Sequence, residues 1–385
     1  MTLFELFYAM PLHFQKLAHT VRIELIMEKR IYIDTFANAQ PLSFILKQKV
    51  SAAAINTEYS ANFGLQKFLK YPILILKFCG LFPYSFDSKK LFITQKISKW
   101  LVFWTVLANL FFFLALPAVL YGAFSQLGDL KMQSPDVVVW IIQGQLSIFI
   151  VVCFYLDSVA KWKKTQQFWN TMQAFLYSVI HDPEEETKAR SLKSYTTRIC
   201  LVMGLCHIAY NLLYVIIIGS TLTETGIPVW IAGLLCFWNL ICTSTYWVQV
   251  LLILFLRFFV HFFDIIERCF KKASTNVKIS NSNEFEATMK MYRECIELIR
   301  EFSEVFAFKL SIATLLSAYS IFIGFRTSIV LLTFENHTAA VSTEQLYDLL
   351  LCLPIYVCSL FVFLVYCDLG SKIVEKVQQN LQSCS

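Results

Sequence analysis

The sequence predicts an all-α fold, a polytopic membrane helical bundle with six spans, and three observations support this. Of its 385 residues, 57% are hydrophobic and only 16% are charged, whereas a soluble domain is about 45–50% apolar and about 25% charged. Six runs match the roughly 20 apolar residues that cross a bilayer core as a helix. The basic residues gather on one side of these runs. This pattern excludes a soluble enzyme and a disordered chain.

The six predicted spans are nearly free of Asp, Glu, Lys and Arg, and no polar face recurs in them at helical period. Lys309 is the exception, and it lies near one end of its span, where a lysine can extend to the headgroups. Pro117 and Pro354 lie within spans and are expected to kink their helices. The spans cover residues 100–121, 137–155, 199–220, 230–255, 305–325 and 349–367.

The region before the first span, residues 1–99, mixes charged and apolar residues and is predicted to be cytoplasmic. Its most apolar stretch, 71–86, carries Lys77 near its middle and a proline toward each end. Lysines flank this stretch on both sides, so a span here would place one basic flank outside the cell. We therefore expect an interfacial or re-entrant helix and turn rather than a span.

Lysine and arginine residues are distributed very unevenly between the two sides of the spans. The positive-inside rule therefore places the N-terminus, the long loops and the C-terminus in the cytoplasm. We expect a multi-pass protein of the plasma membrane with this orientation. Segments 1–99, 156–198, 256–304 and 368–385 hold 30 of the 33 basic residues, and the outer loops 122–136, 221–229 and 326–348 hold 2.

Two further patterns agree with this orientation. The only N-glycosylation sequon begins at Asn336, in a loop predicted to be outside, so we expect a glycoprotein modified at this residue. None of the 12 cysteines falls in a predicted outer loop, so no disulfide framework is expected. The outer loops are short, which leaves no folded domain outside the membrane to capture a protein ligand.

The two long inner loops are predicted to be cytoplasmic helical extensions of the spans. Residues 161–180 keep apolar side chains at helical spacing, and the Asp-Pro pair at 182–183 breaks this pattern before a new helix begins. Residues 255–270 continue the fourth span inward, and 285–306 form a helix that enters the fifth span. The segment 368–385 begins a C-terminal cytoplasmic helix.

Motifs for catalysis and cofactor binding are absent from the sequence. It contains no GxSxG, HExxH, GxxxxGK[ST] or CxxC pattern, so we expect no enzyme activity, no cofactor and no metal site. The spans hold no Asp or Glu, which argues against a proton-driven carrier. The net charge of +6 is spread between apolar runs, so nucleic acid is not an expected partner. His207, the one histidine within a span, is interpreted as a packing residue.

Uncharged polar and aromatic residues on the predicted outer half of the spans are the best candidates for binding a small organic ligand. Small-molecule pockets are mostly apolar and aromatic, with a few placed polar groups. Interhelical hydrogen bonding is the alternative for each residue, and anchoring at the membrane interface is the alternative for Trp230 and Tyr347. The candidates are Gln143, Gln145, Tyr214, Trp238, Asn239, Tyr319 and Tyr347.

Three segments resemble the insect chemoreceptor superfamily, and most of all its gustatory receptors. Residues 69–86 (LKYPILILKFCGLFPYSF) resemble the stretch before the first span of gustatory receptors. Residues 291–330 (MYRECIELIREFSEVFAFKLSIATLLSAYSIFIGFRTSIV) are similar to the inner helix and fifth span of the family. Residues 366–381 (YCDLGSKIVEKVQQNL) resemble the inner helix after the sixth span. The short outer loop 221–229 favours the gustatory branch over the odorant branch.

This resemblance implies a ligand-gated cation channel subunit that lies in membrane lipid and responds to a small organic tastant. It also implies a homo- or heterotetramer with other chemoreceptor subunits. An odorant receptor subunit working with a co-receptor, and a membrane carrier or scaffold without channel activity, remain the alternatives. Family members carry a pore-lining seventh span with a TYxxxxxQF-type signature. The sequence given ends at Ser385 after six spans, so it is expected to lack that helix.

Overall fold

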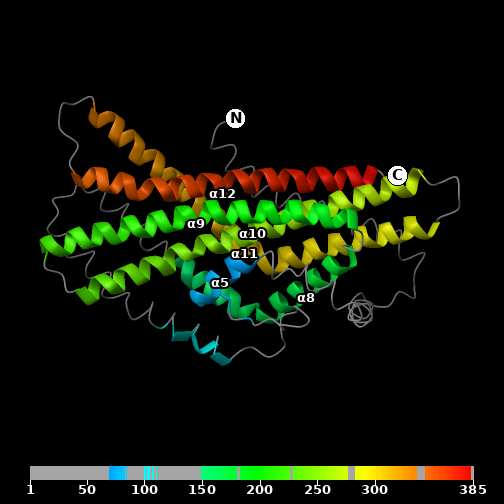
Figure 1. The fold of residues 1–385 in the computed structure, drawn as a ribbon, viewed down its shortest axis with the longest axis horizontal. Helices are drawn as coiled ribbons and strands as arrows, with labels where there is room; N and C mark the ends of the chain where they lie inside the picture. Colours follow the sequence, from blue (N-terminus) through cyan, green and yellow to red (C-terminus); the bar gives the residue numbers. More distant parts are fainter. Residues whose placement is uncertain are drawn as a thin grey trace.

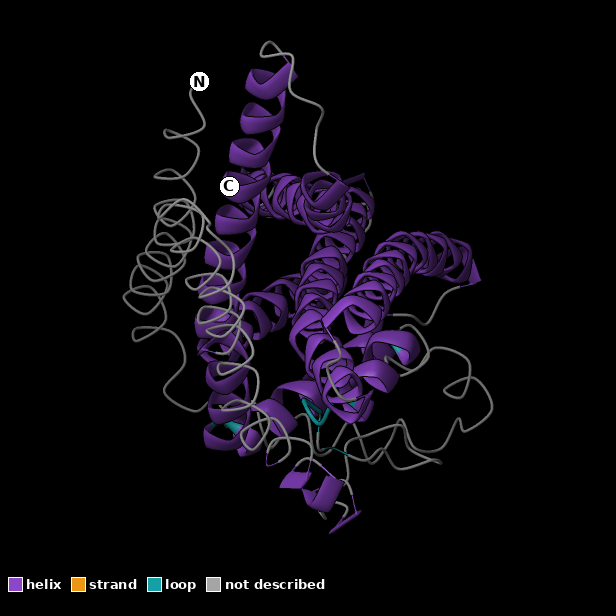
Figure 2. Cartoon of the chain, turned by 90° about the vertical axis from the view of Figure 1, so that its left-hand side faces the viewer, coloured by secondary structure: helices purple, strands orange, loops and turns teal. Residues whose placement is uncertain are grey.

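The computed structural model shows a bundle of α-helices, and the residues it describes contain no strand (Figures 1 and 2). It describes residues 69–82, 84, 99–100, 102–104, 106–107, 110, 149–179, 183–225, 229–275, 282–335 and 343–382, some of them as backbone alone. The helices are α5 (Lys70–Phe78), α8 (Trp162–Val179), α9 (Pro183–Thr225), α10 (Val229–Thr275), α11 (Ser282–Glu335) and α12 (Thr343–Gln382), with a short apolar helix at Phe149–Ala160.

The predicted all-α membrane bundle is confirmed. Among the described residues, four helical segments are long and apolar enough to cross a membrane, and each overlaps one of the last four predicted spans. These segments are Leu192–Ile217, Ala232–Ala273, Glu284–Phe322 and Tyr356–Asn380. On α9, Leu205, Ile208 and Leu212 form an exposed apolar stripe suited to lipid. The predicted spans 100–121 and 137–155 are described only in part, so the number of spans and their orientation stay predictions.

The helical extensions of the spans predicted from the sequence are confirmed as continuous helices, whereas their cytoplasmic location stays a prediction. The predicted break at the Asp-Pro pair 182–183 separates α8, which ends at Val179, from α9, which begins at Pro183. Proline suits this position because the first turn of a helix leaves its backbone N–H groups unpaired in any case. α10 runs from the fourth span through the inner extension to Thr275, and α11 begins at Ser282 and enters the fifth span without interruption.

The connection between α11 and α12, predicted to be an outer loop, is shorter than predicted. α11 continues to Glu335 and α12 begins at Thr343, so the connection is residues 336–342 rather than 326–348. Residues 326–335 contain neither glycine nor proline. A helix satisfies its own backbone hydrogen bonds, so it continues past the apolar run where no such residue ends it.

α10 is the central helix and contacts α5, α9, α11 and α12. The C-terminal half of α10 is rich in buried phenylalanines, among them Phe255. The Phe255 ring packs against Phe168 and Trp169 of α8 and against Phe302 and Phe306 of α11, with centroid distances between 5.1 and 6.0 Å. Such ring pairs add about 0.5–1.5 kcal/mol each beyond the area they bury. This cluster fixes α8 and α11 on α10; the three helices are labelled in Figure 1.

α5 and the turn after it have the helix-and-turn form expected for residues 71–86. The nine residues of α5 are too few to span a bilayer. Ile73 and Leu76 are buried on the side that faces α10, whereas Leu74 on the other side is exposed. Gly80 ends the helix with φ 72°, a left-handed conformation that glycine adopts without steric cost.

Candidate ligand-binding site

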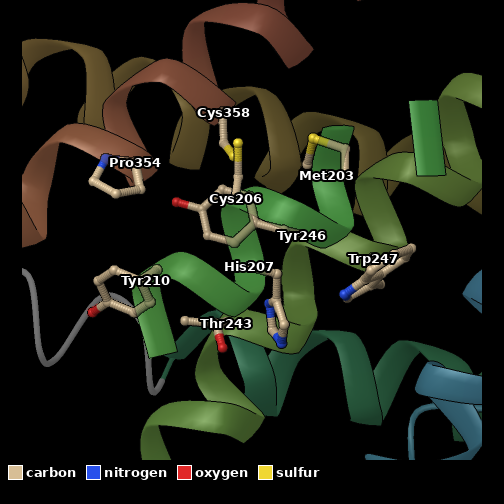
Figure 3. Close-up of a pocket in the computed structure, with 9 residues that line it drawn as sticks. All are labelled: Met203, Cys206, His207, Tyr210, Thr243, Tyr246, Trp247, Pro354 and Cys358. Atoms are coloured by element: carbon tan, nitrogen blue, oxygen red, sulfur yellow. The ribbon is translucent and has the colours of Figure 1, made fainter. Parts of the chain in front are cut away.

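A cleft between α9, α10 and α12 is lined by aromatic, sulfur-containing and small side chains (Figure 3). It holds about 320 Å³ of empty space, including the part that is open to the surroundings. The lining residues recur at three- and four-residue intervals, so on each helix they share one face. They are Met203, Cys206, His207 and Tyr210 of α9, Thr243, Tyr246 and Trp247 of α10, and Pro354 and Cys358 of α12.

The cleft is apolar over most of its surface, and none of its lining residues is charged. Met203, Trp247 and Cys358 are buried, whereas His207 is half-buried. The His207 imidazole meets the Trp247 ring edge to face, with 6.2 Å between the centroids. The sulfur atoms of Cys206 and Cys358 point toward each other across the α9–α12 boundary (Figure 3). The site therefore offers aromatic and polarizable contacts to an uncharged molecule.

A hydrogen-bond network joins α9 to α10 beside the cleft. The Tyr210 hydroxyl donates to Asn239 Oδ1 at 3.2 Å, and Asn239 Nδ2 donates to Asn211 Oδ1 at 3.1 Å. Asn211 Nδ2 donates to Thr243 Oγ1 at 3.3 Å and to the backbone oxygen of His207 at 2.8 Å. Polar side chains in membrane bundles typically satisfy one another in this way. The network holds the α9 and α10 walls of the cleft in a fixed register.

A second set of contacts joins the cleft to α11 and α12. The Tyr246 hydroxyl lies 3.4 Å from the hydroxyl oxygens of both Ser320 on α11 and Ser359 on α12. Near this junction, the Tyr366 hydroxyl of α12 donates to the backbone oxygen of Gln249 at 3.1 Å. Tyr246 thus lines the cleft with its ring and contacts two further helices with its hydroxyl. A displacement of this side chain would be transmitted to both helices.

None of the predicted ligand residues is among the nine residues that line the cleft. Asn239 is buried and takes part in the network, which is the interhelical hydrogen bonding named above as the alternative to ligand binding. The Tyr214 ring packs on the Tyr210 ring, with 6.4 Å between the centroids. Tyr319 is half-buried on α11 and does not line the cleft. The backbone at Trp238 and Tyr347 is helical and their side chains are not described, whereas Gln143, Gln145 and Asn336 lie outside the described residues.

The residues that do line the cleft carry a weak signal in the sequence. Met203, Cys206, His207 and Tyr210 fall at helical spacing. Periodicity can group these four residues on one face of the helix. Every face of this span is apolar, however, so the sequence does not show which face packs against another helix. Methionine and cysteine look like ordinary membrane residues, and His207 reads as a single polar residue in a helix.

Lys309 does not extend to the headgroups as expected, because its side chain is buried inside the bundle. It pairs with Asp157, which the short helix Phe149–Ala160 carries just beyond the predicted second span. Lys309 also lines a second cavity, of about 450 Å³ including its open part, between α5, α8, α10 and α11. Tyr84 lines it too, and burial raises the pKa of Tyr84 to about 12.

The C-terminal parts of α10 and α12 are joined by a group of charged residues. Lys376 Nζ lies 2.7 Å from Glu267 Oε2 and 3.0 Å from Asp264 Oδ1. Lys271 binds the other oxygen of Glu267 at 2.6 Å. Hydrogen bonds from Lys271 and Lys376 lower the pKa of Glu267, although burial acts in the opposite direction. This junction holds the two helices together outside the apolar runs.

The family model described as 7tm Chemosensory receptor matches residues 69–384. The match covers most of the chain and includes every helix described above, so the chain belongs to this family of chemosensory receptors. The resemblance to insect chemoreceptors is thereby confirmed. A search of curated proteins gives no significant match. The fold and the family together define a membrane chemoreceptor with a small aromatic cleft among its helices.

Proposed function

We propose that the protein is a gustatory-type receptor of the plasma membrane, a subunit of a ligand-gated cation channel that responds to a small organic tastant. The observation that carries this proposal is the uncharged aromatic cleft where α9, α10 and α12 meet. Small-molecule sites commonly lie between the helices of a bundle and are mostly apolar with a few polar groups. Membership of a chemosensory receptor family supports a sensory role for such a cleft.

The cleft is suited to couple ligand binding to a rearrangement of helices. A ligand that fits one arrangement of α9, α10 and α12 better than another shifts the population toward that arrangement. Tyr246 provides the connection, since its hydroxyl reaches Ser320 and Ser359 on two other helices. In an assembly of four subunits, the inner junction at Lys376 would keep α10 and α12 moving together.

The test is whole-cell recording of cation current from cells that express the protein alone or with other chemoreceptor subunits. We expect a current evoked by a small organic tastant, with a raised half-maximal concentration in Trp247→Ala, because this ring forms a wall of the cleft. Trp230→Ala is the matched control, since Trp230 is 65% exposed at the start of α10. Equal changes of the half-maximal concentration in Trp247→Ala and Trp230→Ala would count against the cleft as the ligand-binding site.

Two alternative functions give different outcomes in the same cells. An odorant receptor subunit would give a volatile-evoked current only when a co-receptor is co-expressed. A carrier or scaffold would give no evoked current in any combination, and a carrier would also show saturable uptake of a labelled solute. No evoked current with any partner, across a broad ligand panel, would overturn the channel proposal.

A further inference from the structure

Among the described residues of the cleft, the His207 imidazole and the Trp247 indole N–H are the polar side-chain groups without a hydrogen bond, and the imidazole alone can both donate and accept. The hydroxyls of Tyr210 and Thr243 already donate within the α9–α10 network, and the Tyr246 hydroxyl contacts two serines. Within the described part of the chain, no hydrogen bond reaches the His207 imidazole, whose described contact is the edge of Trp247. A neutral imidazole has one donor nitrogen and one acceptor nitrogen. Both are therefore open to a ligand.

The rest of the cleft excludes charged and highly hydroxylated molecules. An ion placed there would lose its hydration without a counter-charge, since the nine lining residues include no Lys, Arg, Asp or Glu. A sugar would bring several hydroxyls to a surface where, among the described residues, only His207 and the Trp247 indole N–H have no hydrogen bond of their own, and each unpaired hydroxyl would weaken its binding. Aromatic rings and sulfur atoms instead favour a planar apolar molecule.

The size of the cleft sets a further limit. Its 320 Å³ of empty space includes the part that is open to the surroundings, so the enclosed space between the helices is smaller than this. A single ring with a short substituent fits this space better than a fused ring system.

We propose that the cleft selects small, uncharged, single-ring compounds with one hydrogen-bonding group, and that His207 binds this group. This inference rests on the proposed function, since it names the ligand class of the same cleft. His207 is then a specificity residue, and Trp247 positions its ring.

The test compares four compounds that share a benzene ring, together with glucose. Benzyl alcohol carries one hydroxyl, toluene carries no polar group, and benzoate and benzylammonium carry opposite charges. We expect benzyl alcohol to be the most potent agonist, with a half-maximal concentration about two- to tenfold below that of toluene, as one hydrogen bond provides. Benzoate, benzylammonium and glucose should be inactive at the same concentrations.

His207→Phe separates hydrogen bonding from packing, because phenylalanine keeps a ring against Trp247 and lacks the two nitrogens. In this variant benzyl alcohol and toluene should become equally potent, whereas His207→Asn should keep part of the difference. Ile208→Ala is the control, since the neighbouring Ile208 is 64% exposed and does not line the cleft. It should leave the wild-type ratio unchanged.

Two results would overturn the proposal. One is a benzyl alcohol to toluene ratio that His207→Phe leaves intact, and the other is a response to glucose or benzoate without one to benzyl alcohol. If no compound evokes a current, the channel proposal fails. The ligand class is then tested separately, by measuring the binding of tritiated benzyl alcohol to the purified wild-type protein and to the purified His207→Phe variant. Binding that is equal in the two proteins, or absent from both, would contradict the role of His207.

Discussion

Asp157 and Lys309 form an ion pair inside the bundle, with 3.0 Å between Oδ2 and Nζ and with both side chains only 7% exposed. Asp157 Oδ1 also binds Lys161 Nζ at 2.9 Å, one helical turn further along the chain. The Lys309 ammonium lies 5.6 Å from the centre of the Phe306 ring. This group connects the end of the short helix Phe149–Ala160 to α11, so it fixes the relative position of two helices that contribute to the second cavity.

Removing the shared carboxylate should be more damaging than removing one of its partners. Asp157→Asn leaves Lys309 buried without an anion, a situation that costs about 3–5 kcal/mol. Lys309→Met should cost less, because Asp157 keeps Lys161. Thermal unfolding of detergent-purified variants measures both effects. Lys164→Met is the control, since its pair with Glu304 is exposed and contributes about 0–1 kcal/mol. The reverse order of Asp157→Asn and Lys309→Met would refute the assigned pairing.

Gly324 permits close packing of α11 against α12, as small residues do in membrane bundles. A Cβ atom added at Gly324 would lie 2.8 Å from Cβ of Tyr356, with the Tyr356 ring closer still. Gly324→Ala should therefore lower the free energy of unfolding by about 1–3 kcal/mol. At Gly219 the added Cβ would have no described neighbour within 4 Å apart from the adjacent backbone of its own helix, so Gly219→Ala should raise the free energy of unfolding by about 0.5–1 kcal/mol. Equal melting temperatures of the two variants would contradict this packing.

The junction of Glu267 with Lys271 and Lys376 predicts a loss of stability in acid. Hydrogen bonds from these lysines hold the pKa of Glu267 below its ordinary value of 4.5. A carboxylate whose pKa is lower in the folded state than in the unfolded state stabilises the fold at pH values above its unfolded-state pKa. This stabilisation disappears as the pH falls through the folded-state pKa. Melting temperatures measured from about pH 7 to about pH 3 should fall less steeply for Glu267→Gln than for the wild type. Glu286→Gln, an exposed change on α11, should follow the wild-type curve.

Glycosylation at Asn336 tests the orientation of the bundle. The sequon begins directly after α11, and the positive-inside rule places this end of the helix outside. The wild type expressed in insect or mammalian cells should shift in mass on glycosidase treatment, and Asn336→Gln should run at the position of the treated protein. A glycosidase-sensitive shift that remains in Asn336→Gln would refute this residue as the acceptor. A sequon that is never modified while a predicted inner loop is labelled from outside would reverse the topology.

The sequence predicts the helices of this protein far better than it predicts their contacts. Helical spacing and the Asp-Pro pair were sufficient for α8 and the start of α9, because both are local signals. The pair of Asp157 with Lys309 escaped prediction because 152 positions separate its members and neither residue identifies so distant a partner. The cleft escaped for a similar reason: a span that is apolar on every face does not show which side meets another helix. Asn239 is a predicted ligand residue with interhelical hydrogen bonding as its alternative, and the structure shows its side chain bonded to Tyr210 and Asn211.

The most direct measurement is photolabelling of the purified protein with a diazirine derivative of an aromatic alcohol that activates it, mapped by mass spectrometry. The cleft predicts labels near His207 on α9, Trp247 on α10 and Cys358 on α12, with each label suppressed by excess unmodified agonist. Labels that competition suppresses only at other helices, for example around the second cavity at Phe82, would show that the ligand binds elsewhere and would contradict the assignment of the cleft.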